Sequence, residues 1–287
     1  MKALYDISAP AKLNTFLHIT GRHADGYHLL QSIFMLIDWC DKLHFELRAD
    51  GEISREDLGA TLPAQDLMVR AATALRQASG CRSGVHMAID KHIPMQAGMG
   101  GGSSDAASTL LALNQLWGLH LPLTELMRIG LGLGADVPFF LGGHNAWVEG
   151  IGEALSPMAL PAAQFLVVKP AHGLATQEIF SDASLKRDSK PATIAGFAQM
   201  GATDIFKFGR NDLQAVAQRL CPGVDQALRW LDLQGLSGRM TGSGSAVFAH
   251  VAHGFELQSD VALPAHFEFK LCDNLQAHPL LGWAKTD

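Results

Sequence analysis

Hydrophobic and polar residues alternate near the start of the chain, and this predicts a β-strand from Ile7 to Ile19. Successive side chains of a strand point to opposite faces, so Lys12 and Asn14 are expected to share one face. Turn-forming residues at positions 20–28 then predict a loop, and the apolar stretch Ile33 to Trp39 follows it. Polar side chains therefore gather in one loop at the end of a strand.

Apolar residues then recur with helical spacing in two segments on either side of a glycine-rich run. The first segment spans 66–78, and residues 85–89 after it are typical of a strand. The second ends before Gly118, and Ser103 or Ser104 is expected to cap its start. A further helix is predicted from about 122 to 131.

The second half of the chain begins with a stretch that contains Pro157 and Pro161. We place a domain boundary there, with domains at 1–155 and 156–287. Expected elements of the second half are strands at 165–168 and 246–251 and helices at 212–219 and 223–231. The whole pattern predicts an α+β protein.

The composition fits a folded enzyme, because 48% of the 287 residues are hydrophobic and 17% are charged. A net charge of −6 argues against a surface made for nucleic acid or anionic lipid. The start of the chain has no apolar signal core, and no apolar run approaches the roughly 20 residues that span a bilayer. Four widely spaced cysteines indicate reduced thiols, so we expect a soluble, cytoplasmic protein.

The strongest chemical signal is the segment from Pro94 to Asp105, PMQAGMGGGSSD. Glycines let backbone N–H groups approach a polyphosphate, and the start of the following helix adds donors and a positive dipole end. A flexible glycine turn is the alternative. The segment is not a Walker A loop, since no lysine follows the last glycine, and its glycine spacing does not match a dinucleotide fingerprint.

This pattern, P-x-x-x-G-x-G-G-G-S-S, resembles the phosphate loop of the galactokinase, homoserine kinase, mevalonate kinase and phosphomevalonate kinase superfamily. Segments 9–14, 21–28, 134–139, 211–213 and 238–244 are similar to the branch that acts on a cytidine diphosphate-linked polyol. The resemblance covers nearly the whole chain and thins at 181–201 and after 254. It implies a two-domain small-molecule kinase with its active site in the cleft between an N-terminal α/β domain and a C-terminal ferredoxin-like domain.

The resemblance implies transfer of the ATP γ-phosphoryl group to the 2-hydroxyl of 4-diphosphocytidyl-2-C-methyl-D-erythritol, in the non-mevalonate route to isoprenoid precursors. A carboxylate placed against a hydroxyl can take its proton, and Asp136 is assigned that role. Lys12 would keep the carboxylate ionised and offset developing charge. The alternatives are that Asp136 only caps a helix and that Lys12 is a solvated surface charge.

A cytidine ring needs a stacking face and hydrogen bonds at its edge. The resemblance implies that Tyr27 stacks, that His28 bonds the cytosine edge and that Asn14 contacts the substrate. Phe180 is the expected opposite wall, with Thr176 beside it. Surface aromatic residues at 27–28 and a core phenylalanine at 180 are the alternatives.

The predicted ATP-binding residues are Pro94, Gly98, Gly100, Gly101, Gly102, Ser103, Ser104 and Asp66. A second glycine loop, Thr241, Gly242, Ser243 and Gly244, is expected to close over the transferred group, although a hairpin turn explains it equally well. Gln96 stands where the family has a small residue, and Asp66 stands where it often has asparagine, so nucleotide contacts there are open. Mg²⁺ is expected with ATP, and Ser104 is the one ligand that the sequence suggests.

Two other functions fit some of these signals. A relative that acts on mevalonate, homoserine or a sugar would not need the aromatic loop at 27–28. A non-catalytic nucleotide and metabolite sensor on the same fold would not need both Lys12 and Asp136. We expect a small-molecule kinase that is a monomer or a weak homodimer, with no nucleic-acid or membrane partner.

Overall fold

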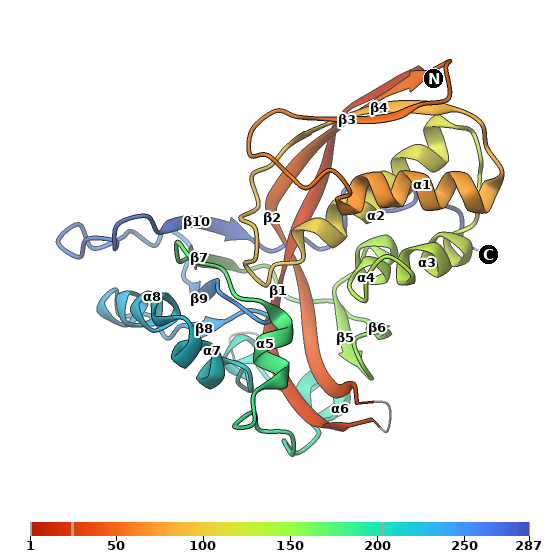
Figure 1. The fold of residues 1–287 in the computed structure, drawn as a ribbon. Helices are drawn as coiled ribbons and strands as arrows, with labels where there is room; N and C mark the ends of the chain where they lie inside the picture. The colour runs from red at the N-terminus through yellow and green to blue at the C-terminus, as the bar shows by residue number, and fades with distance from the viewer. Residues whose placement is uncertain (1, 24–25, 202–203, 287) are drawn as a thin grey trace.

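The computed structural model describes residues 2–23, 26–201 and 204–286, and two long antiparallel strands run through its centre (Figure 1). They are β1 (Ala3–Arg22) and β2 (His28–Arg48), which pair over nearly their whole length. The strand predicted at Ile7–Ile19 is confirmed, and the apolar stretch 33–39 lies in β2. The expected loop 20–28 is shorter than predicted, and its residues 24 and 25 lie outside the described part.

The first sheet contains β1 and β2 and has the order β3-β4-β2-β5-β6, with β1 paired to β2. Its other strands are β3 (Ile53–Asp57), β4 (Gly84–Asp90), β5 (Ala146–Glu149) and β6 (Ala154–Pro157). Its helices are α1 (Leu67–Ser79), α2 (Gly101–Leu116), α3 (Leu123–Leu131) and α4 (Val137–Gly142). Helix α2 packs between this sheet and the other helices, and twelve of its residues are buried. The helices predicted at 66–78 and 122–131 and the strand at 85–89 are confirmed.

The start of α2 corrects one prediction. Gly100, not Ser103 or Ser104, occupies the N-cap position, with a left-handed backbone at φ 70°, and no side chain caps the helix. Glycine adopts that conformation without steric cost, so the helix begins three to four residues earlier than a cap at Ser103 or Ser104 would allow. Ser104 therefore lies inside the helix and is fully buried.

The second sheet has the order β10-β7-β9-β8. Its strands are β7 (Gln164–Lys169), β8 (Arg239–Met240), β9 (Val247–Val251) and β10 (Glu268–Asp273). The helices of this half of the chain are α5 (Thr176–Ser181), α6 (Ile194–Ala198), η1 (Ile205–Lys207), α7 (Gln214–Leu220) and α8 (Pro222–Leu233). The strands predicted at 165–168 and 246–251 and the helices at 212–219 and 223–231 are confirmed to within two residues.

The two sheets share a hydrophobic core. Leu13 and Ile33 of the first sheet belong to the same buried cluster as Phe165 and Phe248 of the second. Burial of this much apolar surface between sheets is favourable and fixes how the loops at their ends face each other. Among the described residues, none of the helices has the length and apolar character needed to cross a bilayer.

The end of the chain returns to the first sheet after β10. The backbone N–H of His278 donates to the carbonyl of Gly143 at 2.8 Å, and that of Leu123 donates to Lys285 at 2.9 Å. Leu280 and Ala284 belong to the buried core cluster that also contains residues of α2 and α3. The division at 155/156 remains a prediction, and this last segment packs with the first sheet.

Candidate active site

The two glycine loops, which are more than a hundred residues apart in sequence, contact each other directly through their backbones. The N–H groups of Ser245 and Ala246 donate to the carbonyls of Gln96 and Ala97, both at 3.2 Å. Gly98 has a φ of +71°, and a Cβ there would lie 2.4 Å from the carbonyl oxygen of Thr241. Only glycine fits this approach, so the second loop is more than a local hairpin turn.

We expect Gly98→Ala to raise the KM for ATP by about tenfold or more, because the added Cβ forces the two loops apart and strains the backbone. Gly118→Ala is a matched control. Gly118 has a similar φ of +64°, but nothing lies within 4 Å of a Cβ placed there. Steady-state kinetics with varied ATP would measure both, and equal effects of the two substitutions would contradict a role for loop contact.

Lys12 and Asp136 face each other beside these loops. Lys12 lies on β1 and Asp136 directly precedes α4, and the distance from Nζ to Oδ2 is 3.9 Å. The Lys12 side chain is 4% exposed and that of Asp136 is 32% exposed. Lys12 is therefore not the solvated surface lysine of the alternative interpretation.

Several contacts hold the Lys12 ammonium in place. It donates to Asn14 Oδ1 and lies 4.7 Å from the centroid of the Phe34 ring. The backbone N–H of Lys12 donates to the carbonyl of Met99 in the phosphate loop at 2.9 Å. Burial lowers the pKa of Lys12, and the negative charge of Asp136 works in the opposite direction. A further anion beside Lys12 would stabilise its charged form in the same way.

Asp136 occupies the N-cap position of α4, but its side chain makes no capping hydrogen bond. Its backbone is already helical, at φ −83° and ψ −14°, whereas a capping residue normally has an extended conformation. Helix capping therefore does not account for this aspartate, and its carboxylate is directed to Lys12 instead.

A cavity of about 520 Å³ surrounds this pair. Its walls include residues predicted for catalysis, substrate binding and both glycine loops, namely Lys12, Asn14, Gly98, Gly100, Asp136, Thr176, Phe180, Gly242, Ser243 and Gly244. Thr176 and Ser243 are linked through their hydroxyl oxygens at 2.7 Å, and Thr241 Oγ1 accepts from the backbone N–H of Asn14 at 2.9 Å. The fold thus brings these predicted residues to one place.

A second cavity of about 300 Å³ lies along the phosphate loop and shares Gln96, Gly98 and Gly100 with the first. Other predicted nucleotide residues line it, namely Asp66, Pro94, Gly101, Gly102 and Ser103. Ser104 does not line it. Gln96 has a φ of 53°, so the residue that departs from the family pattern sits in a strained backbone position at the junction of the two cavities.

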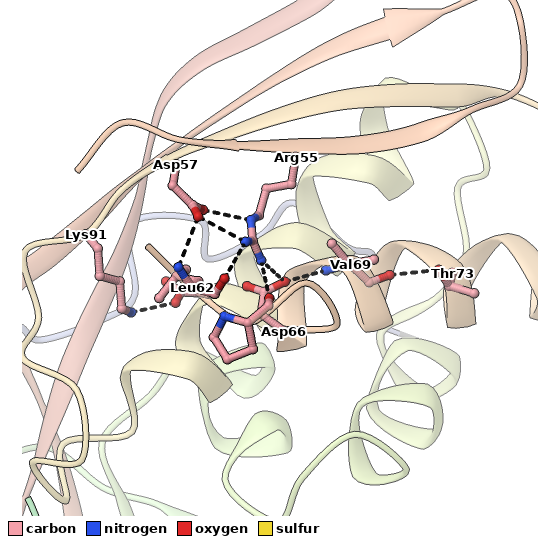
Figure 2. A network of polar contacts seen from close by, with 9 residues as sticks. Arg55, Asp57, Leu62, Asp66, Val69, Thr73 and Lys91 are labelled. Atoms are coloured by element: carbon pink, nitrogen blue, oxygen red, sulfur yellow. Dashed lines mark hydrogen bonds and ion pairs between the residues drawn. The ribbon is translucent and has the colours of Figure 1, made fainter. Parts of the chain in front are cut away.

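Asp66 is held firmly at the rim of this second cavity (Figure 2). It caps α1 by accepting from the N–H of Val69 at 3.1 Å, and the same oxygen pairs with Arg55 at 2.7 Å. Arg55 also donates to the carbonyls of Leu62 and Pro63. Figure 2 shows Arg55 between Asp57, Leu62 and Asp66. These contacts fix the loop before α1 against the cavity and engage one of the two carboxylate oxygens of Asp66.

Sequence reasoning missed a buried ionic group beneath the phosphate loop. Lys91 pairs with Asp105 at 2.6 Å and with Asp41, and it lines the second cavity. Burial opposes its charge, yet the two carboxylates raise the pKa of Lys91, whereas burial raises the pKa of Asp105 well above its usual value. The position of Lys91 three residues before Pro94 was the only signal in the sequence.

The predicted nucleobase residues form a third cavity, of about 730 Å³. Tyr27, His28 and Phe180 line it, and the ring centroids of His28 and Phe180 lie 5.1 Å apart. Tyr27 is 62% exposed, which leaves its ring accessible to a ligand. The cavity shares Thr176 and Phe180 with the catalytic cavity, so one extended ligand can occupy both.

The described part of the chain offers few side chains that could coordinate a divalent ion. In the part of the chain that the structure describes, no group of three or more His, Cys, Asp or Glu side chains could hold a metal. The Ser104 Oγ has no hydrogen-bond partner among the described residues, but Ser104 is fully buried and lines neither the catalytic nor the phosphate-loop cavity, so its role as a metal ligand stays a prediction. Mg²⁺ commonly takes most of its ligands from water and substrate phosphates, which suits such a site.

Comparison with known proteins identifies the family. Residues 66–144 match the model of the GHMP kinases N terminal domain, and residues 190–259 match the GHMP kinases C terminal model. The 4-diphosphocytidyl-2-C-methyl-D-erythritol kinase of Albidiferax ferrireducens is 67% identical over 287 residues, covering 100% of this chain and 98% of the relative. The enzyme of the same name from Polaromonas sp. is 63% identical, covering 99% of this chain and 95% of the relative.

Solved structures agree with this. A crystal structure of 4-(cytidine 5'-diphospho)-2C-methyl-D-erythritol kinase matches with a TM-score of 0.77 and 32% identity, covering 93% of this chain and 98% of the other. Homoserine kinase from Cytophaga hutchinsonii has a TM-score of 0.68 at 14% identity, over 97% and 96% of the two chains, and shares the fold. The α+β architecture expected from the sequence is confirmed. The chain belongs to the GHMP kinases and, among them, to the family of the 4-diphosphocytidyl-2-C-methyl-D-erythritol kinases.

Proposed function

We propose that this kinase transfers the γ-phosphoryl group of ATP to the 2-hydroxyl of 4-diphosphocytidyl-2-C-methyl-D-erythritol. One observation carries the assignment: the cavity with Lys12 and Asp136 shares walls with the phosphate-loop cavity and with the aromatic cavity. A polyol linked to a nucleobase through a diphosphate needs adjoining cavities of this kind, one for the base, one for the polyol and one for the phosphates of ATP. The names of the two relatives described above support the same substrate.

The side chains of the central cavity divide the work. Asp136 orients the hydroxyl and takes its proton as the O–P bond forms. Lys12 offsets negative charge on the oxygens of the transferred group. Asn14 holds Lys12 through its side-chain oxygen and is placed to contact the polyol.

Backbone groups of the two glycine loops and the start of α2 bind the phosphates. Helix α2 has sixteen residues, so its N-terminal donors and dipole are well developed. Mg²⁺ would be held chiefly by ATP phosphate oxygens and water, and it would supply charge neutralisation at the phosphates. Tyr27 and Phe180 enclose the cytosine ring, and His28 bonds its edge.

A coupled assay of ADP release tests this proposal against a small panel of alcohols. We expect turnover with the cytidyl polyol and little with mevalonate, homoserine or galactose. Consumption of ATP with mevalonate but not with the cytidyl compound would assign the protein to another substrate. Calorimetric binding of both ligands without ADP release at any concentration would favour a sensor.

We also place the protein in the cytoplasm, as a monomer or weak homodimer. Its four cysteines are all free, two of them buried, which fits a reducing compartment. Size-exclusion chromatography with light scattering would measure the oligomeric state at micromolar concentration.

A further inference from the structure

The segment 210–212 lies beside β1 like a short added strand. The backbone N–H of Leu17 in β1 donates to the carbonyl of Arg210 at 2.9 Å, and the N–H of Asp212 donates to the carbonyl of Leu17 at 2.8 Å. Asn211 lies between these two bonds and forms a parallel bridge with Leu17. Its backbone is therefore fixed relative to the strand that carries the catalytic lysine.

The side chain of Asn211 reaches from there to the second glycine loop. Its Nδ2 donates to the carbonyls of Met240 and Gly242, both at 2.8 Å, and its Oδ1 accepts from the N–H of Leu213 at 2.9 Å. Two acceptors on one side and a donor on the other determine which way round the amide lies. Asn211 is 5% exposed and does not line the catalytic cavity, so it affects the reaction only through the groups that it holds.

These bonds orient the peptide groups of the loop. A trans peptide is planar and has its C=O and N–H on opposite sides, and the peptide between Gly242 and Ser243 is trans. Since the Gly242 carbonyl faces Asn211, the N–H of Ser243 points away from Asn211. The peptide after Met240 follows the same rule, because its carbonyl accepts from Asn211 and its N–H donates across the loop at 3.1 Å.

The N–H of Ser243 is a donor without an acceptor. Within the part of the chain that the structure describes, no carbonyl or side chain accepts from it. Gly242 and Ser243 line the catalytic cavity together with Lys12 and Asp136. A backbone donor held in such a place stabilises negative charge on a reacting group without having to reorganise.

We propose that Asn211 is a positioning residue for phosphoryl transfer, which holds the Gly242 carbonyl and so keeps the N–H of Ser243 available to an oxygen of the transferred group. This inference rests on the proposed function, because it assumes that the γ-phosphoryl group of ATP enters the catalytic cavity. It does not depend on which alcohol accepts that group. A hydrogen bond that strengthens as charge develops contributes more to kcat than to substrate affinity.

The substitution Asn211→Asp tests this role, because aspartate has the same shape and keeps the acceptor for Leu213, but its carboxylate offers no N–H to the two carbonyls. Asn274→Asp is the matched control. Asn274 is 8% exposed, donates to the carbonyl of Pro161 and accepts from the N–H of Ala163, both at 2.9 Å, and lines neither the catalytic nor the phosphate-loop cavity. Asn211→Ser is an uncharged second variant, which covers the case that a buried carboxylate prevents folding.

For each protein we would measure thermal unfolding, the kcat of the folded enzyme and the KM for ATP. NMR of ¹⁵N-labelled protein would follow the backbone amide of Ser243 before and after addition of Mg²⁺ and a non-hydrolysable ATP analogue. In the unaltered enzyme we expect this resonance to shift when the nucleotide binds. Both Asn211 variants should lose most of the shift and lower kcat by about tenfold or more, with a smaller change in the KM for ATP. Asn274→Asp should keep the shift and the kcat, even where its unfolding temperature falls equally.

Different failures have different meanings. A Ser243 amide that does not respond to the nucleotide in the unaltered enzyme would overturn the inference. So would an unchanged kcat or an unchanged amide shift in the Asn211 variants. An equal loss in Asn274→Asp would also overturn it, because buried amides would then act on turnover only through stability. Absence of turnover with the cytidyl polyol would instead overturn the proposed function, and the amide shift with nucleotide alone would still test the role of Asn211.

Discussion

Asp136→Asn is expected to lower turnover by at least about a hundredfold, the lower end of what a general base contributes, while the KM for ATP stays nearly unchanged. An amide can still bond a hydroxyl, but it cannot accept its proton. The phosphate loop and its cavity do not include Asp136, so nucleotide binding should persist. ADP release under saturating substrate measures the loss of turnover.

Asp225→Asn provides the control. Asp225 is also an acidic residue near the start of a helix, with a similar exposed fraction of 35%, and it pairs with Arg229 on α8. Its substitution should leave turnover within error of the unaltered enzyme. Full activity of Asp136→Asn would show that this carboxylate is not the general base and that its role is structural.

Lys12→Met is expected to lower kcat by roughly a hundredfold to a thousandfold, the range found when one group that stabilises transition-state charge is removed. Methionine has a similar length and no charge, so the cavity stays filled and Asp136 loses the cation beside it. Replacing a buried charge by an apolar side chain of similar volume often leaves stability little changed. Thermal unfolding measured beside kinetics separates the two effects.

Lys169→Met is a suitable comparison, because Lys169 is another buried lysine whose pKa burial lowers. It donates to the carbonyls of Pro170 and His172 and does not line the catalytic cavity. Its substitution should cost far less turnover than that of Lys12. A comparable loss in both variants would show that Lys12 matters for stability alone.

The sequence pattern predicted much of this site, because some of the site residues are neighbours along the chain. Alternation along β1 placed Lys12 and Asn14 on one face, and their side chains do bond. The glycine run predicted a strand-to-helix loop, and it is one. The prediction of a serine N-cap for α2 was wrong. Serine is a common cap, but here Gly100 in a left-handed conformation precedes the helix, and Ser104 lies buried inside it.

Contacts between distant segments could not be predicted in this way. Asp41 of β2, Lys91 after the end of β4 and Asp105 of α2 come from three separate segments, and each has an unremarkable surrounding sequence. Arg187 lies in the stretch where the family resemblance is weakest, and only the fold brings it to His28. Nothing in a single sequence indicates which arginine meets which histidine across 159 residues.

The return of the chain end to the first sheet bears on how the protein is made. Ribosomes synthesise a chain from its N-terminus to its C-terminus, and N-terminal domains usually fold first. Here Leu280 and Ala284 belong to the same buried core cluster as residues of α2, the helix that begins at the phosphate loop. A nascent chain that has already produced β1 to β6 therefore still lacks part of their packing. Assembly of the nucleotide site should then wait until the segment with Leu280 and Ala284 has been made, so a truncated product that lacks this segment should fold poorly even if it retains every catalytic side chain.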